Sequence, residues 1–362
     1  ANDVIKIGVA GAHTGDLAPY GLPTKAAAEL VVAETNAKGG INGKKVELVA
    51  ADEQCKPELA TNVASKLVSE GVKVVIGHIC SGATKAALGI YKSAKVIVIS
   101  PSATNPPLTK SGEYPNFYRT IASDDDQAIL AANFATETLK AKKVAIIREV
   151  SNDYSVGLAK FFADEFVKLA GDPAAIVATA DYNTGDQDFT AQLTELIAKK
   201  PDVVFMPAYF AEGAIIMKQA RELGAKFRLM GADAMDNPDT LKLGGKAAEG
   251  FLHTTFPYDP AMPNMSPVAK RFTEAWKAAY PDKETNVNGA LGYNTYFLIL
   301  DAIKRANSSD PKAIAKALAE TKDLPTALGL LSINATHDAE MPVGIIEYKD
   351  GKRVYVGEVT PK

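Results

Sequence analysis

The stretch VKVVIGHICSGATKAALGIY, residues 72–91, shows the unit from which the fold is built. Val72–Ile76 is a nearly continuous apolar run, which is typical of a strand covered on both faces. A turn of small and polar residues follows, and the spacing predicts a helix from about Gly82 to Tyr91. An apolar strand, a polar turn and a helix in succession indicate a parallel α/β sheet.

The same unit recurs on both sides of this stretch and forms a first series. After Pro57, a residue that a first helical turn tolerates, Leu59, Val63 and Leu67 mark one buried helix face. A further helix is expected at Leu22–Lys38. The strands expected in this series are Val4–Val9, Lys45–Ala50, Lys73–Ile76 and Val96–Ser100.

A second series of the same kind follows further along the chain. Its expected strands are Val144–Ile147, Ala175–Ala180, Val203–Met206 and Phe227–Met230, and its expected helices are Asp124–Leu139, Val156–Leu169, Phe189–Ala198 and Ala211–Leu223. Continuous apolar strands separated by helices predict parallel sheets covered on both faces. The two series therefore predict two doubly wound α/β lobes, and 362 residues are enough for both.

The C-terminal part of the chain departs from this alternation. Its expected helices are Met265–Tyr280, Asn288–Asn307 and Pro311–Glu320, and its expected strands are Gly329–Ile333, Val343–Tyr348 and Val354–Glu358. These strands are too few for a third lobe, so we expect them to complete the first two. The chain must then cross between the lobes several times, which predicts an N-terminal lobe of residues 1–121 plus 253–330 and a C-terminal lobe of residues 122–252 plus 331–362.

The composition of the chain limits the kinds of partner that it could bind and bears on its cellular compartment. The chain has 40 basic and 43 acidic residues, so no broad basic field favours nucleic acid as a partner. No apolar run approaches the roughly 20 residues needed to cross a bilayer. The N-terminal ANDVIKIGVA has neither a charged n-region nor an h-region, so we expect that any signal peptide has been removed or never existed. Two cysteines fit a disulfide in an exported protein or buried thiols in a cytosolic one.

The sequence contains no convincing catalytic, phosphate-binding or metal motif. Gly77–Gly82 has the glycine spacing of a phosphate loop, but Ala83 stands where that loop needs lysine. The HxC arrangement of His78 and Cys80 is too weak a signal for zinc. Acidic residues at Asp124–Asp126 fit an ordinary helix start. We therefore expect no cofactor, no metal and no enzymatic activity.

What remains is polar and aromatic chemistry at the predicted strand ends, where open parallel sheets place their ligands. Ser81 and Thr84, at a predicted helix N-terminus, suit a carboxylate, and Ser102 and Thr104 lie one strand away. Asp233 could neutralise an ammonium group. The tyrosines in these turns could enclose an apolar side chain, and they are Tyr20, Tyr154 and Tyr209. Each residue alone has an ordinary structural explanation, but together they suit an α-amino acid.

At this point the sequence resembles the periplasmic leucine/isoleucine/valine-binding proteins, the substrate-binding subunits of branched-chain amino acid ABC importers. The resemblance covers almost the whole chain. It is carried, in order, by GAHTGDLAPYG (11–21), NAKGGINGKKVEL (36–48), the turn from Asp52 to Cys55, VIGHICSGAT (75–84), SPSATNPPLT (100–109), YSVGLA (154–159), GDQDFTAQL (185–193) and AEGFL (248–252). It implies the type I periplasmic-binding fold, with two lobes and three crossovers, in a periplasmic monomer that delivers an amino acid to membrane permease subunits.

The resemblance also implies roles for single residues. Ser81 and Thr104 match residues that hold the ligand carboxylate, Ser102 matches a residue that offers its carbonyl to the ammonium, and Asp233 stands at the acid that neutralises it. The relatives have glutamate at that last position, one methylene longer. The remaining positions implied to bind ligand are Tyr20, Ile79, Ala103, Tyr154 and Tyr209, together with either Leu291 or Tyr293 from a late helix.

Cys55 and Cys80 match cysteines that form a disulfide in members of the family. Both follow predicted strands that we take to be adjacent, where such a bond is within reach. Cys80 is then a brace beside the ligand turn and not a nucleophile. Three alternatives stay open: the same scaffold with an amide, urea, γ-aminobutyrate or an aromatic acid as ligand, a ligand-sensing receptor domain, and an enzyme.

Overall fold

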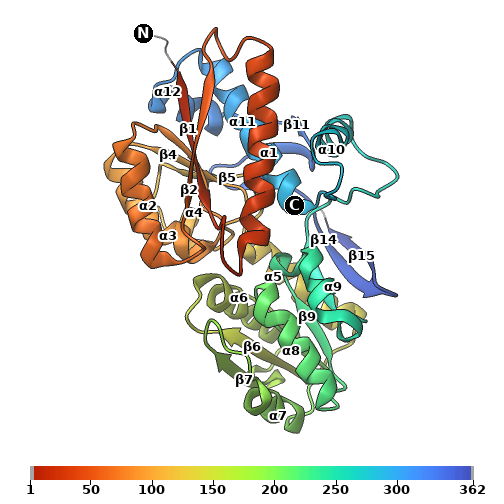
Figure 1. Cartoon of the computed structure of the whole chain (residues 1–362). Coiled ribbons are helices and arrows are strands. Elements are labelled where there is room, and N and C mark those ends of the chain that lie inside the picture. The colour runs from red at the N-terminus through yellow and green to blue at the C-terminus, as the bar shows by residue number, and fades with distance from the viewer. Residues whose placement is uncertain (1–3, 360–362) are drawn as a thin grey trace. The chain divides into compact units, whose positions relative to one another are not determined.

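The computed structural model describes residues 4–359, which form two compact units (Figure 1). The first unit holds the chain up to Ala122 together with Pro257–Met341. The second holds Ser123–Phe256 together with the chain from Pro342 onward. The chain therefore passes from one unit to the other three times, as the family resemblance implied.

Two short segments lie in a different unit from the one that the sequence suggested. Strand β10 (Leu252–Thr255) belongs to the second unit because it pairs with β9 (Arg228–Gly231) and β14 (Val343–Lys349). Residues 331–341 belong to the first unit because they complete a small antiparallel sheet there. Pairing with strands distant in the sequence thus decides where each segment belongs.

The first unit is built on a five-stranded parallel sheet in the order β2-β1-β3-β4-β5. Its strands are β1 (Ile5–Gly11), β2 (Val46–Asp52), β3 (Val74–Ile76), β4 (Ile97–Ser100) and β5 (Phe117–Arg119). The third and fourth strands are buried along their whole length, which is why they read as continuous apolar runs. The sequence pattern missed β5, whose three residues end in a buried arginine.

Helices cover this sheet, and a small three-stranded antiparallel sheet completes the unit. These elements are α1 (Ala18–Ala37), α2 (Pro57–Ser69), α3 (Ser81–Ser93), α4 (Pro107–Lys110), α10 (Pro267–Ala279), α11 (Val287–Ala306), α12 (Pro311–Ala319), β11 (Leu324–Thr326), β12 (Gly329–Ile333) and β13 (Ala339–Glu340). Helices α2 and α3 bury Leu67 and Leu88 in one apolar core with Val75 and Val98 of the sheet. Each buried Leu or Val side chain contributes about 1.5–3 kcal/mol to such a core.

The second unit is built on a seven-stranded sheet in the order β15-β14-β10-β9-β8-β6-β7. Besides β9, β10 and β14 it contains β6 (Val144–Glu149), β7 (Ile176–Tyr182), β8 (Val203–Phe205) and β15 (Lys352–Val359). Its helices are α5 (Asp124–Asn133), α6 (Asp153–Ala170), α7 (Thr190–Ala198), α8 (Phe210–Glu222) and α9 (Pro238–Gly244). A π-helical turn, Phe134–Thr138, follows α5, and short 3₁₀ turns lie at Pro173–Ala175, Asp233–Met235 and Gly245–Ala248. Strand β14 runs antiparallel to its two neighbours, β10 and β15. The five strands β10, β9, β8, β6 and β7 are parallel to one another.

Both units repeat one strand order. The order β2-β1-β3-β4-β5 of the first unit corresponds to β7-β6-β8-β9-β10 in the second. In each, the direction of winding reverses at the first strand, so the switch point lies between β1 and β3 and between β6 and β8. Ligands of open α/β sheets bind outside the carboxyl ends of the strands at this point. A ligand is therefore expected near the turns that follow β1, β3, β6 and β8.

Candidate functional site

The switch point of the first unit is occupied by the turn after β3. Gly11 ends β1, and a Cβ atom there would lie 2.4 Å from Cγ1 of Ile79. Only glycine leaves room for this buried isoleucine. Tyr20, also buried, lies in the first turn of α1, where a Cβ on the neighbouring Gly21 would lie 1.9 Å from the carbonyl oxygen of Ala12. Helix α1 thus begins directly against the turn that follows β1.

Helix α3 begins at Ser81 without a side-chain cap. The N-cap residue Cys80 makes no capping hydrogen bond, and the first amide groups of a helix have no acceptor within the helix. The Ser81 hydroxyl accepts a hydrogen bond of 3.3 Å from the backbone N–H of Asn105, which leaves its own proton available. The Thr84 hydroxyl, by contrast, donates to the carbonyl oxygen of Cys80 at 2.8 Å. Thr84 is therefore engaged within the helix, whereas Ser81 can donate to an acceptor outside it.

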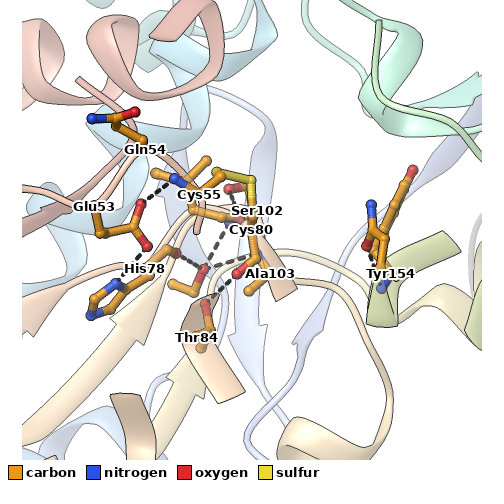
Figure 2. The surroundings of a disulfide bond; sticks show 12 residues. Glu53, Gln54, Cys55, His78, Cys80, Thr84, Ser102, Ala103 and Tyr154 are labelled. Carbon is orange, nitrogen blue, oxygen red and sulfur yellow. Dashed lines mark hydrogen bonds and ion pairs between the residues drawn. A yellow bond between two sulfur atoms is a disulfide. The ribbon is translucent and has the colours of Figure 1, made fainter. Parts of the chain in front are cut away.

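The turn after β4 is joined to the turn after β3 by hydroxyl groups (Figure 2). Ser100 Oγ donates to the carbonyl oxygen of His78 at 2.6 Å and accepts from the backbone N–H of Ala103 at 2.8 Å. Ser102 Oγ donates to the carbonyl oxygen of Ile79 at 2.8 Å. These bonds hold the two turns together.

Thr104 lies in the turn after β4 and carries a buried hydroxyl group. Its side chain is 0% exposed, and its hydroxyl has no hydrogen-bond partner among the residues that the structure describes. Buried polar atoms in folded proteins nearly always have a partner, because leaving one unpaired costs about 1–3 kcal/mol. The Thr104 hydroxyl can therefore still form a hydrogen bond with an atom from outside the described residues.

The disulfide between Cys55 and Cys80 is present, as the resemblance implied, with a Cα–Cα distance of 5.5 Å (Figure 2). The strands that precede the two cysteines are not adjacent, however, because β1 lies between β2 and β3. Gln54 and Cys55 both adopt positive φ angles, 55° and 59°, in the turn after β2. The bond thus spans the carboxyl end of β1 and borders the turn after β3.

A buried polar network that sequence reasoning missed lies beside the disulfide. His78 Nδ1 is 3.0 Å from Oε2 of Glu53, and His78 Nε2 is 2.9 Å from the hydroxyl of Tyr91. The other oxygen of Glu53 accepts from the backbone N–H of Cys55 at 2.8 Å. Both ring nitrogens of His78 have partners, so His78 supports the turn. Within residues 4–359 no group of three or more His, Cys, Asp or Glu side chains is placed to hold a metal ion.

In the second unit, three predicted residues come together at the corresponding turns. Tyr154 lies in the first turn of α6, Tyr209 precedes α8, and Asp233 follows β9. The Tyr154 hydroxyl donates to Oδ1 of Asp233 at 2.6 Å, and the rings of the two tyrosines stack with centroids 5.3 Å apart. Burial raises the pKa of the Asp233 carboxyl, and hydrogen bonds from Tyr154 and Gln127 oppose that rise.

Asn152 is the residue of this group that sequence reasoning missed. Its side-chain oxygen caps α6 by accepting from the backbone N–H of Tyr154 at 2.9 Å. Its amide donates to Oε2 of Glu149 at 3.0 Å, and its side chain also makes a hydrogen bond with the Tyr209 hydroxyl. One asparagine therefore holds both tyrosines. An asparagine before a helix is common, so the sequence carried no sign of this second role.

In the first unit, hydrogen bonds join the turns that carry the predicted residues Ile79, Ser81, Ser102, Ala103 and Thr104, and Tyr20 is buried in α1 of the same unit. In the second unit, Tyr154 contacts both Tyr209 and Asp233. Of the two late-helix candidates, Tyr293 packs its ring against Phe272 with centroids 4.8 Å apart, and Leu291 is buried on the same helix α11.

Two doubly wound lobes with polar and aromatic clusters at their switch points define a two-lobed α/β binding protein of the type I periplasmic-binding fold. The chain belongs to the periplasmic binding protein family, whose sequence profile matches residues 4–353. No helix within residues 4–359 combines the length and the apolar character needed to cross a membrane.

Three similar proteins illustrate this membership. The leucine-, isoleucine-, valine-, threonine- and alanine-binding protein of Pseudomonas aeruginosa is 34% identical over 328 residues, which cover 90% of this chain and 85% of that protein. The crystal structure of the leucine-binding protein LivK of Thermotoga maritima superposes with a TM-score of 0.91 at 33% identity, covering 99% of both chains. The LivJ protein of Streptococcus pneumoniae, solved in complex with isoleucine, gives a TM-score of 0.90 at 32% identity, covering 99% of this chain and 100% of that one. The expected fold is confirmed.

Proposed function

We propose that this chain is an extracytoplasmic solute-binding protein that captures an aliphatic, branched-chain α-amino acid and delivers it to the membrane permease of an ABC importer. Its relatives in Pseudomonas aeruginosa and Thermotoga maritima are named as binding proteins for such amino acids. The function is one of binding and release by a periplasmic monomer, and the ligand leaves unchanged.

The carboxylate of the ligand binds to the first unit. The observation that carries this assignment is the buried Thr104 hydroxyl, which has no partner among the described residues. The next residue, Asn105, donates its backbone N–H to the hydroxyl of Ser81 at the uncapped start of α3, so the two hydroxyl-bearing residues are linked. Hydroxyl donors and free helix amides bind an anion without a basic side chain, because the helix N-terminus carries a partial positive charge. Ile79 and Tyr20 supply apolar surface beside them.

The ammonium group of the ligand binds to Asp233 of the second unit. Burial raises the pKa of Asp233, and a cation beside the carboxylate would lower it again, so ligand binding would relieve the cost of burying this charge. The stacked rings of Tyr154 and Tyr209 provide a flat apolar wall for an aliphatic side chain. Burying such a side chain contributes roughly 1.5–3 kcal/mol.

The proposed mechanism is capture by closure of the two units. The first unit holds the carboxylate, and a hinge motion then adds Asp233 and the tyrosines, because the ligand has higher affinity for the closed state than for the open one. The chain crosses from one unit to the other after Ala122, Phe256 and Met341, and these crossings are where we expect such a hinge.

A thermal-shift screen tests the ligand class, since a compound that binds only the folded protein raises its melting temperature. We expect leucine, isoleucine and valine to raise it, and leucine recovered after incubation to be chemically unchanged. The comparison set is isobutyramide, urea, γ-aminobutyrate and benzoate. A response confined to any of these four would contradict the proposal, and conversion of leucine would show an enzyme.

A further inference from the structure

The guanidinium of Arg119 lies behind the ligand-facing turn of the first unit. Arg119 ends β5 and is 0% exposed. Its Nη1 donates to the carbonyl oxygens of Ala103 at 2.9 Å and of Asn105 at 2.8 Å. Its Nε donates to Oδ1 of Asp338 at 2.5 Å, and its Nη2 donates to the hydroxyl of Thr109 at 2.8 Å. One side chain thus grips the turn on both sides of Thr104 and anchors it to Asp338.

The two carbonyls that Arg119 holds belong to the segment that presents the proposed carboxylate donors. The carbonyl of Ala103 shares its peptide group with the N–H of Thr104. A charged donor on that oxygen polarises the peptide and strengthens its N–H as a donor. The carbonyl of Asn105 is held by the same nitrogen, while the N–H of Asn105 donates to Ser81. The guanidinium therefore acts on Thr104 directly and on Ser81 through one residue.

We propose that Arg119 is a positioning residue for ligand binding: its planar fork orients Thr104 and Ser81 toward one carboxylate without touching the ligand. This inference rests on the proposed function, which assigns the carboxylate to these two residues. A lysine cannot take over the role, because an ammonium is a point charge that cannot span two carbonyls, a hydroxyl and a carboxylate in a fixed plane.

The chain offers a matched control in the same unit. Arg305 donates from Nε to Asp301 at 2.7 Å, from Nη1 to the carbonyl oxygen of Ala317 at 2.8 Å, and from Nη2 to the hydroxyl of Thr321 at 2.8 Å. This guanidinium also joins a carboxylate, a carbonyl and a threonine hydroxyl, but it lies on α11 and α12, away from the ligand turn. The Arg305 side chain is 37% exposed whereas Arg119 is buried, so Arg305→Lys controls for the loss of a guanidinium clamp elsewhere in the unit and not for the full stability cost at Arg119.

The test measures leucine affinity by calorimetry, and the melting temperature without ligand, for the full chain. We expect Arg119→Lys to weaken leucine binding by tenfold or more, while Arg305→Lys leaves affinity within about twofold. Thr104→Ala should weaken binding as well. If Arg119 acts through Thr104, the variant with both changes binds more tightly than the product of the two single effects predicts, because coupled residues are not additive.

Three outcomes separate this inference from the proposed function. If the unmodified chain binds no amino acid, the proposed function fails. If it binds leucine but Arg119→Lys does not weaken binding, only the positioning role is overturned. If the effects of Arg119→Lys and Thr104→Ala simply multiply, the part of that role that runs through the Thr104 hydroxyl is overturned. Should Arg119→Lys not fold, Thr109→Val replaces it, because it removes one anchor of the fork and leaves the charge paired with Asp338. Unchanged leucine affinity in Thr109→Val would then overturn the role.

Discussion

The hydroxyl of Tyr154 donates a 2.6 Å hydrogen bond to Oδ1 of Asp233, and the amide of Gln127 donates to the same oxygen at 3.1 Å. Both donors stabilise the ionised carboxylate, while burial disfavours it and raises its pKa. The second unit therefore holds a carboxylate that is oriented by neutral donors and has no cation among these contacts. This arrangement suits a site whose cation arrives with the ligand.

Asp233→Asn should weaken leucine binding by about 100-fold or more, because an amide cannot balance a desolvated ammonium. The melting temperature without ligand should hardly change or should rise, since the substitution removes a charge that burial disfavours. Calorimetry and thermal unfolding measure the two effects. The control is Asp164→Ala, whose exposed carboxylate pairs with Lys160 on the surface of α6. Undiminished affinity in Asp233→Asn would remove Asp233 from the site.

The raised pKa of Asp233 predicts how affinity and stability depend on pH. Only the ionised carboxylate binds an ammonium, so leucine affinity should fall as the pH drops through the raised pKa. The stability of the protein without ligand should depend on pH in the opposite direction. A carboxyl whose pKa is higher in the folded state stabilises the fold when protonated, and this contribution is lost as pH rises from its ordinary value of 3.8 to the raised one.

Affinity titrated between about pH 4 and pH 8 tests this prediction, since the α-carboxylate and ammonium of leucine stay ionised across this range. Asp233→Asn should lose the acid dependence while keeping Glu149, whose pKa burial also raises. If the dependence persists in Asp233→Asn, another group, with Glu149 the first to examine, controls it.

Asn152→Asp separates the two roles of this residue. An aspartate keeps the oxygen that caps α6, but it cannot donate to Glu149 or to the Tyr209 hydroxyl. It also places a second carboxylate 3.0 Å from Glu149, so we expect destabilisation at neutral pH that weakens at acidic pH. Leucine affinity should fall because Tyr209 loses its support.

The matched control is Asn237→Ala, which removes the cap of α9 in the same unit, where the side chain accepts from Asp239. Losing the hydrogen bond from the backbone N–H of Asp239 to Asn237 should lower the free energy of unfolding by about 1 kcal/mol and leave the affinity for leucine unchanged. If Asn152→Asp bound leucine as tightly as the original chain, Asn152 would be a helix cap and nothing more.

Most elements could be predicted from the sequence because apolar strands and amphipathic helices each have a recognisable pattern within a short stretch of residues. The strands Ile97–Ser100 and Gly329–Ile333 lie within a residue of their expected bounds. Strands β5 and β10 escaped because they are short and carry polar residues where the other strands are apolar, since β5 reads FYR and β10 reads LHTT. Strand β10 also pairs with β14, far along the chain. The strand order, and with it the placement of β1 between the two cysteine-bearing turns, depends on that long-range pairing.

The candidate site divides in the same way. Polar residues in turns after strands, such as Ser81 and Asp233, are visible in sequence because the fold places ligands there. Arg119, Asn152 and Glu53 were missed because each acts through buried partners that only the folded chain brings together. A buried arginine in a short strand or an asparagine at a helix start carries no local sign of what it holds.

Removal of the disulfide tests the frame around the ligand turn. The bond joins cysteines 25 residues apart, and closing such a loop stabilises a protein by roughly 3 kcal/mol on the chain-entropy estimate. Cys55→Ala combined with Cys80→Ala should therefore lower the melting temperature by several degrees and also lower the denaturant concentration at the midpoint of chemical unfolding. Leucine should still bind, more weakly, because hydroxyl bonds from Ser100 and Ser102 continue to join the two turns. Thiol titration of the unfolded, unreduced chain should find no free thiol, and two free thiols would show that the bond does not form.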